Sequence, residues 1–466
     1  MLFSSTVFLV LFLTGTLLIY YCIPRPWRWA KNMFLLLASL VFYWWGEPDF
    51  VVVMMGSIGL NYLFGLWVHA CKTRGKSVKP AIFATAAANL SLLFVYKYLN
   101  FTLRNLKLLG FDVPVTEIAL PIGISFFTFQ AMSYVFDIAL GQGRVQKNPL
   151  NVGLYVSLFP QLVAGPIVKY ETVADEILHR RENWEDFSEG VRRLLIGLAK
   201  KVLLSNQMAL VADAAFGAAA PSAAFAWLGS ICYTLQIYYD FSGYSDMAIG
   251  LGRMFGFHFL ENFNYPYISR SFTEFWRRWH ISLSTWFRDY VYFPLGGSRV
   301  ESKQRHIFNL LVVWLLTGIW HGANWTFVAW GLLAFVVLVC EKFWGLGKNL
   351  PNWARHGYTL LVINTSWVLF RSDSLTHAGK FLWAMVGGNG WGCDLSAFYL
   401  REQLVFLVCA LLFAAPVYKW VEKKLANSPV AILTDVLHAA VLLGLFLVCI
   451  TYLVKGTYNP FIYFNF

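Results

Sequence analysis

The histidine at position 321 has the setting in this chain that most favours chemistry. It lies in the segment LLTGIWHGANWTFVAWG, between two apolar runs, with Gly318 and Gly322 on either side. An ionisable side chain within an apolar stretch is costly, and by default it marks a functional site. Imidazole titrates near neutral pH and can take a proton from an attacking hydroxyl. The sequence therefore predicts a catalytic His321; the alternative is a neutral histidine that packs against a backbone carbonyl.

A second histidine lies in an aromatic and basic segment. His280 stands in EFWRRWHISLSTWFRDYVYFPLGG, close to Arg277, Arg278 and Arg288. Alternating aromatic and guanidinium side chains are typical of a membrane interface, where arginine also binds phosphate. We expect this segment near the cytoplasmic face. The alternative is a solvated interfacial helix that takes no part in chemistry.

Other signals for common catalytic sites are weak or absent. The segment YYDFSGYSDMAIGLGRMFGF contains Asp240 and Asp246, but two acids six positions apart do not share a helical face, so a paired-carboxylate device is not expected. Its glycines do not follow a strand, which argues against a dinucleotide site, and the chain has no Walker A, HExxH or GxSxG motif. The seven cysteines include no CxxC pair. We therefore expect neither a disulfide framework nor a metal site.

The composition indicates an all-α, polytopic integral membrane protein. Hydrophobic residues make up 58% of the 466 and charged residues 13%, whereas about 25% of a soluble domain is charged. The net charge of +12 comes from Lys and Arg in short loops between apolar runs. That is the positive-inside pattern, reinforced by attraction to anionic membrane lipid, and it does not indicate nucleic acid. We expect residues 1–466 to form a single membrane-embedded domain.

Apolar runs of near-membrane length recur along the chain and predict roughly 11 transmembrane helices. Residues 152–168 contain Pro160, Gly165 and Pro166, which predicts a broken, re-entrant segment buried in protein. Residues 171–201 carry both charge signs and predict an amphipathic helix in the cytoplasmic interface. Basic loops place both termini outside. The apolar runs are 3–23, 34–45, 50–69, 80–96, 118–140, 202–216, 223–239, 308–320, 325–340, 358–370, 404–417 and 430–453.

Four segments taken in order resemble a known family. FWRRWHISLSTWFRDYVYFPLGG and LLTGIWHGANWTFVAWG, with YYDFSGYSDMAIG and PQLVAGPIVKY, resemble the membrane-bound O-acyltransferase family in its bacterial polysaccharide branch. The resemblance covers nearly the whole chain. It implies an enzyme of the bacterial inner membrane in which re-entrant and interfacial helices surround a central tunnel. Its members use a cytoplasmic thioester, here acetyl-CoA, and bind no resident cofactor.

The resemblance also assigns roles to residues and partners. His321 matches the catalytic histidine and His280 a second, supporting position, so substitution of His280 should reduce activity less completely. The acyl group would pass to an extracytoplasmic SGNH-type acetyltransferase or esterase, and from there to a polysaccharide acceptor such as alginate or peptidoglycan. Arg277, Arg278 and Arg288 would bind the donor, and Trp320, Asn324, Asp240 and Tyr244 would line the tunnel.

The chain ends in an aromatic tail, FIYFNF, at residues 461–466. An aromatic belt at the outer interface is one explanation. The tail also resembles a terminal motif, F-x-Y-x-x-F, whose tyrosine carries an acyl group in a related system, and Tyr463 is the matching position. Asn465 departs from the Gln or Glu usual in that motif.

Two alternatives to the acetyltransferase hypothesis stay open from the sequence. A transporter or flippase without covalent chemistry would suit broken helices and buried acids, although no inverted repeat is visible. A lipid acyltransferase of the same fold would share the histidines and differ in its acceptor.

Overall fold

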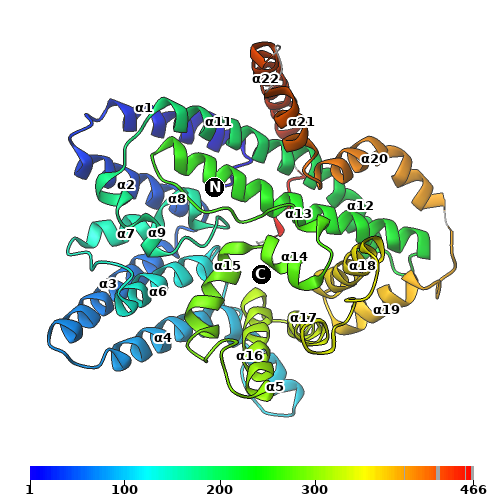
Figure 1. The fold of residues 1–466 in the computed structure, drawn as a ribbon, viewed down its shortest axis with the longest axis horizontal. Helices are drawn as coiled ribbons and strands as arrows, with labels where there is room; N and C mark the ends of the chain where they lie inside the picture. Colours follow the sequence, from blue (N-terminus) through cyan, green and yellow to red (C-terminus); the bar gives the residue numbers. More distant parts are fainter. Residues whose placement is uncertain (393, 427–430, 457, 463–466) are drawn as a thin grey trace. The chain divides into compact units, whose positions relative to one another are not determined.

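Helices make up every regular element that the computed structural model describes, which covers residues 1–392, 394–426, 431–456 and 458–462. Within these residues there is no strand, so the all-α prediction is confirmed (Figure 1). The chain divides into two compact units. Unit 1 comprises Met1–Leu194 and Ser245–Leu260, and unit 2 comprises Leu195–Tyr244 and Glu261–Phe466.

Unit 1 begins with long apolar helices and continues with short ones. The sixth helix, α6, begins at Ile124 and not at residue 118 as predicted. Pro121 has no amide hydrogen, and Gly123 takes a left-handed φ of 76°, so the helix can begin only after them. The first elements are η1 (Val7–Leu13), α1 (Thr14–Cys22), α2 (Arg28–Gly46), α3 (Val51–Thr73), α4 (Lys79–Leu93), η2 (Phe94–Tyr98), α5 (Leu99–Leu108) and α6 (Ile124–Leu140).

The predicted interruption in the middle of the chain is present. Helix α7 (Pro149–Ser157) stops at Leu158, and α8 (Phe159–Leu162) is a single buried turn. The prediction of one interfacial helix over residues 171–201 is wrong, since this range contains several helices. Two short helices, α9 (Tyr170–Val173) and α10 (Glu176–His179), come first.

One long helix then runs across the predicted boundary at residue 201. Asn183 caps α11 (Trp184–Ala199) by accepting a hydrogen bond from the Asp186 amide. The helix continues through a π-helical turn, η3 (Lys200–Ser205), into α12 (Asn206–Gly217). A change from amphipathic to apolar composition is not a helix stop signal, and residues 184–217 contain no proline.

The next helix is likewise longer than predicted. Helix α13 (Ala223–Met254) includes Asp240 and Asp246, beyond the predicted end of a span at residue 239. Most side chains of its second half are buried in protein, so its polar residues do not require the helix to end.

Unit 2 contains the helices that follow α13. Two of them, α19 (Leu375–Met385) and α21 (Val417–Ala426), were not predicted. The elements are η4 (Pro266–Ile268), α14 (Phe272–Arg278), α15 (Ile281–Phe287), η5 (Arg288–Tyr292), α16 (Lys303–His321), α17 (Trp325–Trp344), α18 (Asn352–Arg371), α19 (Leu375–Met385), α20 (Asp394–Phe413), α21 (Val417–Ala426) and α22 (Ala431–Lys455).

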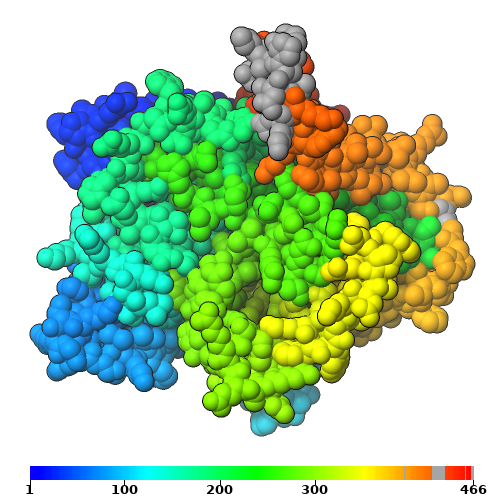
Figure 2. All heavy atoms as spheres, viewed as in Figure 1, coloured from blue at the N-terminus to red at the C-terminus, as the bar shows by residue number. Residues whose placement is uncertain are grey.

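Six helices among the described residues are long and apolar enough to cross a membrane. On the face shown in Figure 2, atoms of α20 (orange) lie at the surface, and leucine, valine and phenylalanine side chains along this helix are exposed. Exposed apolar side chains of this kind suit contact with lipid. The six are Val51–Thr73, Lys79–Leu108, Trp184–Gly217, Trp325–Trp344, Asp394–Phe413 and Val436–Lys455. The number of spans, roughly 11, stays a prediction.

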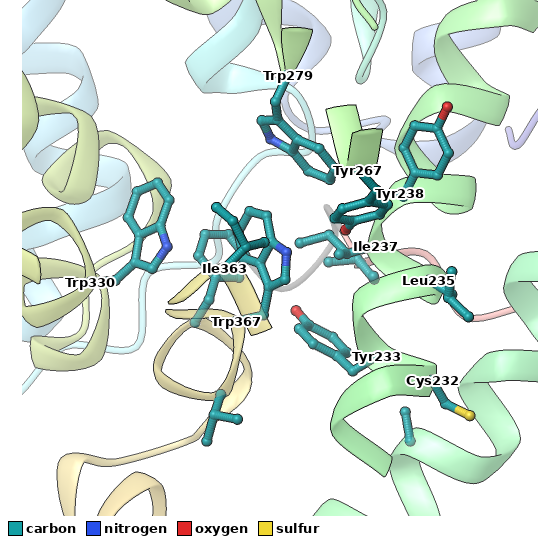
Figure 3. Packing of buried hydrophobic residues seen from close by; sticks show 14 of the residues in the cluster. Cys232, Tyr233, Leu235, Ile237, Tyr238, Tyr267, Trp279, Trp330, Ile363 and Trp367 are labelled. Atoms are coloured by element: carbon teal, nitrogen blue, oxygen red, sulfur yellow. The ribbon is translucent and has the colours of Figure 1, made fainter. Parts of the chain in front are cut away.

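The core of unit 2 is built largely from aromatic side chains (Figure 3). Trp330 of α17 stacks on Trp367 of α18 at a ring distance of 6.1 Å, and Trp279 lies 5.0 Å from Trp367. Tyr238 of α13 meets Tyr267 at 5.4 Å. Lipid is as apolar as these rings, so close packing and dispersion stabilise such a core more than exclusion of water does.

Candidate active site

His321 is the last residue of α16, in a tight connection to α17. The helix ends because Gly322 is extended, and α17 begins one residue after Asn324, whose side chain accepts a hydrogen bond from the Thr326 amide. The two helices touch through their backbones: a Cβ on Gly318 would lie 2.5 Å from the Phe327 carbonyl oxygen. This glycine contact fixes where His321 points.

Aromatic rings enclose the His321 side chain, which is 5% exposed. Trp320, Trp330 and Phe370 each lie edge-on to the imidazole, at ring distances of 5.1 Å. These residues come from α16, α17 and α18, so three helices define the walls around the histidine. The imidazole therefore lies in an enclosure made largely of aromatic rings.

His280 adopts an unusual backbone conformation between α14 and α15. Its φ of 46° lies in the left-handed region, which among the described non-glycine residues only Tyr265 shares. This conformation costs about 1–3 kcal/mol and clusters at functional sites. The histidine is 2% exposed, and its ring meets that of Phe241 at 4.5 Å.

Asn262 determines which nitrogen of His280 carries the proton. Its Oδ1 accepts hydrogen bonds from the amide and the hydroxyl of Ser282, at 3.1 and 2.9 Å, and lies 3.2 Å from Nδ1 of His280. A backbone amide can only donate, so Oδ1 faces the imidazole as an acceptor and Nδ1 must hold the hydrogen. Nε2 then keeps its lone pair and can accept a proton.

The surroundings keep His280 uncharged. Burial lowers its pKa well below the ordinary value of histidine, and repulsion from His321 lowers it further. Nε2 is buried and has no hydrogen-bond partner among the residues that the structure describes. The two imidazole rings lie 6.5 Å apart, and the ring of Trp320 is 6.1 Å from His280. The structure thus brings together the two histidines that the sequence singled out.

Comparison with known proteins places this geometry in a family. The membrane-bound O-acyltransferase family model matches residues 85–370, a range that contains both histidines. The chain belongs to this family. It is therefore an acyltransferase, as the four motifs predicted, and the transporter alternative is not supported.

Relatives of this acyltransferase are named as enzymes that transfer acetyl groups to oxygen. The probable alginate O-acetylase AlgI of Pseudomonas putida is 39% identical, with all of both chains covered. The protein of the same name from Azotobacter vinelandii is 41% identical over 89% of this chain and 83% of its own. The peptidoglycan O-acetyltransferase of Helicobacter pylori is 34% identical over 90% of this chain and 87% of its own.

The three arginines near His280 differ in their surroundings. Arg278 pairs with Glu274 at 2.9 Å, and Arg288 pairs with Asp289 at 2.8 Å, so both charges are partly neutralised. Arg277 forms no ion pair with any described residue, and its charge repels that of Lys342. Lys342 in turn lies 3.0 Å from Nε2 of His306.

The predicted tunnel-lining residues of the acyltransferase fall into three settings. Trp320 contacts both histidines. Asn324 caps α17 and donates a hydrogen bond to the Asp373 carbonyl at 2.8 Å, so its described contacts are with backbone. Asp240 and Tyr244 are buried on α13, where Asp240 pairs with Lys201 at 2.6 Å. Tyr463 lies outside the described residues.

Two positioning residues were missed from the sequence. Asn262 gave no signal, because an asparagine in a loop is usually a turn residue. Lys201 did give one, since a lysine joined without a break to an apolar helix has to find a partner. Among the described residues, no three or more His, Cys, Asp or Glu side chains come together as metal ligands would.

Proposed function

We propose that this acyltransferase takes acetyl from cytoplasmic acetyl-CoA and passes it across the bacterial inner membrane for O-acetylation of an exported polysaccharide. The acceptor is alginate-like exopolysaccharide or peptidoglycan, as the names of the relatives indicate. An extracytoplasmic SGNH-type enzyme completes the transfer, and both termini face that side. The observation that carries the proposal is the pair of buried histidines whose rings lie 6.5 Å apart.

The chemistry requires positioning and a base, because the thioester is already activated. His321 takes the proton from the acceptor hydroxyl while the hydroxyl oxygen bonds to the acetyl carbonyl carbon. The bond from that carbon to sulfur then breaks, and the CoA thiolate leaves and takes up the proton. His280 supports this step, since its buried Nε2 keeps a lone pair and its ring lies 6.5 Å from that of His321.

Donor binding is best assigned to the cations that lack an acidic partner. Of the three predicted arginines, Arg277 is the strongest candidate, because Arg278 and Arg288 each have a carboxylate nearby. Lys342 adds a second cation near Arg277, and it donates a hydrogen bond to Nε2 of His306 at 3.0 Å. Phosphate groups of CoA would relieve the mutual repulsion of these side chains.

Tyr463 is proposed as an acyl carrier between the two faces. A phenol has a pKa near 10, so a neighbouring histidine can remove its proton during attack on the thioester. In the resulting aryl ester the phenolate is a good leaving group, so the acetyl can pass on to a serine of the partner. Tyr463→Phe removes one oxygen and keeps the packing, so it should abolish polymer acetylation; a wild-type rate would leave the aromatic-belt explanation.

Labelled acetyl-CoA added to membranes that contain the acyltransferase, its partner and polymer tests the proposal. We expect label on the polymer and free CoA in equal amounts, and neither with His321→Ala. Label recovered in the lipid extract would favour the lipid acyltransferase alternative. Absence of both CoA release and label transfer would contradict the proposed function.

A further inference from the structure

The C-terminal segment, residues 458–462, is held by polar side chains of unit 2. Asn206 donates to the Asn459 side chain at 3.2 Å, and Lys201 donates to the Pro460 carbonyl. The Ile462 amide donates to Oδ2 of Asp240 at 2.9 Å. Tyr458 donates its hydroxyl hydrogen to Asp213. These contacts reach the segment from η3, α12 and α13.

Lys201 and Asp240 are the two charged residues at the centre of these contacts. Their side chains are 3% and 1% exposed, and Nζ lies 2.6 Å from Oδ1. A buried ion pair rarely repays its desolvation unless further hydrogen bonds satisfy both groups. Here the segment supplies them, since the Pro460 carbonyl faces the ammonium and the Ile462 amide faces the second carboxylate oxygen.

The backbone around the pair is built for close approach. Lys201 lies in the π-helical turn η3, a feature that often marks functional sites. Opposite it on α13, a Cβ on Gly243 would lie 2.8 Å from the Gly197 carbonyl oxygen and 3.2 Å from the backbone nitrogen of Lys201. Only glycine allows the two helices to meet here, which brings Lys201 and Asp240 within ion-pair distance.

We infer that Lys201 and Asp240 form a clamp that docks the C-terminal segment, residues 458–462, and fixes the position of its last residue, Ile462. The clamp contacts backbone atoms at Pro460 and Ile462, so it sets the path of the segment. Phe461 and Ile462 are buried, and the Phe461 ring meets Tyr244 at 5.2 Å.

The clamp also connects the segment to the histidines, a point that rests on the proposed role of Tyr463. Asp240 precedes Phe241 on α13, and the Phe241 ring lies 4.5 Å from His280. The Ile462 amide donates to Asp240, so the clamp holds the end of the described segment against α13. Lys201 and Asp240 would thus be positioning residues for the acyl carrier.

A charge-swapped double variant separates a clamp from an ion pair that only stabilises the fold. Lys201→Asp with Asp240→Lys restores opposite charges, but it sets a cation against the Ile462 amide and a carboxylate against the Pro460 carbonyl. The readout is release of C-terminal residues by carboxypeptidase from purified protein in detergent, followed by mass spectrometry. Asp246→Asn is the matched control, because Asp246 lies on the same helix and pairs with Arg193 at 2.8 Å.

In the wild type, we expect residues 458–462 to survive digestion, whereas the swap should lose them on the order of tenfold faster, since hydrogen bonds to charged groups are lost. The single variants Asp240→Asn and Lys201→Met should also lose residues 458–462 faster than the wild type. Asp246→Asn should lose them at the wild-type rate. A cooperative thermal unfolding transition would show that the swap variant is folded. A swap that digests at the wild-type rate would overturn the clamp.

Failure of the carrier proposal has a different signature. Full polymer acetylation by Tyr463→Phe, together with rapid digestion of the swap, would remove the carrier and leave the clamp standing. Loss of acetylation in Tyr463→Phe, together with slow digestion of the swap, would support the carrier and overturn the clamp.

Discussion

Two buried polar regions of this acyltransferase handle charge in opposite ways. In unit 1, Glu182 accepts hydrogen bonds from Arg28 at 2.6 Å and Lys31 at 3.3 Å, and Tyr20 donates a third. In unit 2, His280 and His321 meet aromatic rings, and the polar partner of His280 is a neutral amide.

The comparison shows that burial alone does not decide whether a group is charged. Burial by itself would raise the pKa of Glu182, but hydrogen bonds from Arg28 and Tyr20 outweigh it and lower the pKa to about 2. At His280, burial lowers the pKa, and no carboxylate opposes the effect. The first region holds a charged carboxylate between two cations, and the second keeps the His280 imidazole neutral, as the proposed chemistry requires.

The largest effect is expected at the histidines. His321→Ala should reduce polymer acetylation by about 10²–10⁴-fold, the usual contribution of a general base. Expression and fold should stay intact, because the rings of Trp320, Trp330 and Phe370 around the position are unchanged. Acetylation assays on quantified, folded protein measure this, and full activity would exclude His321 as the base.

Removal of the charge from the unit 1 network should affect stability and leave chemistry intact. Glu182→Gln should lower the free energy of unfolding by about 3 kcal/mol, since it leaves buried cations without their carboxylate. Glu182 has a folded pKa below its unfolded value, so its contribution is present above about pH 4.3 and lost as pH falls towards 2. Thermal unfolding from pH 7 to 3 should show this loss in the wild type and a flatter profile in the variant.

A smaller and more diagnostic effect is expected at Asn262. Asn262→Asp puts a carboxylate beside Nδ1 of His280, which raises the pKa of the imidazole. Because the neutral ring is the active form, the acidic fall in kcat/KM should move to higher pH, with about a tenfold loss on the acidic side. An unchanged acidic limb would show that His280 does not titrate during the reaction.

The smallest effect on stability is expected at a solvent-exposed ion-pair network of unit 1, centred on His258. His258 is 46% exposed and bridges Glu176 at 2.8 Å and Asp186 at 3.2 Å. Burial lowers its pKa, but the two carboxylates outweigh this and raise it, so its contribution is present below about pH 6.5 and fades as pH rises through the folded value. His258→Gln should cost less than 1 kcal/mol, as measured by thermal unfolding at pH 6 and pH 9.

The sequence predicted the all-α class and the broken segment at residues 152–168, and it singled out two histidines whose rings the structure brings to 6.5 Å. The predicted helix boundary at residue 201 was wrong, because the composition changes there without a stop signal. The predicted start at residue 118 was wrong, because the signal at Pro121 was overlooked. The proximity of His280 to Asn262 could not be predicted, because a left-handed residue sets it and no side-chain pattern encodes that choice. The pairing of Lys201 with Asp240 depends on helix contacts far apart in sequence.

The aromatic enclosure of His321 has a consequence for the energy of the cell. An enzyme that passes an acyl group through an energised membrane must not let protons follow. Proton conduction requires chains of water or titratable groups that exchange protons freely, and rings of Trp320, Trp330 and Phe370 offer neither. If acetyl crosses the membrane here, as the proposed function holds, the same walls would therefore also insulate the proton gradient.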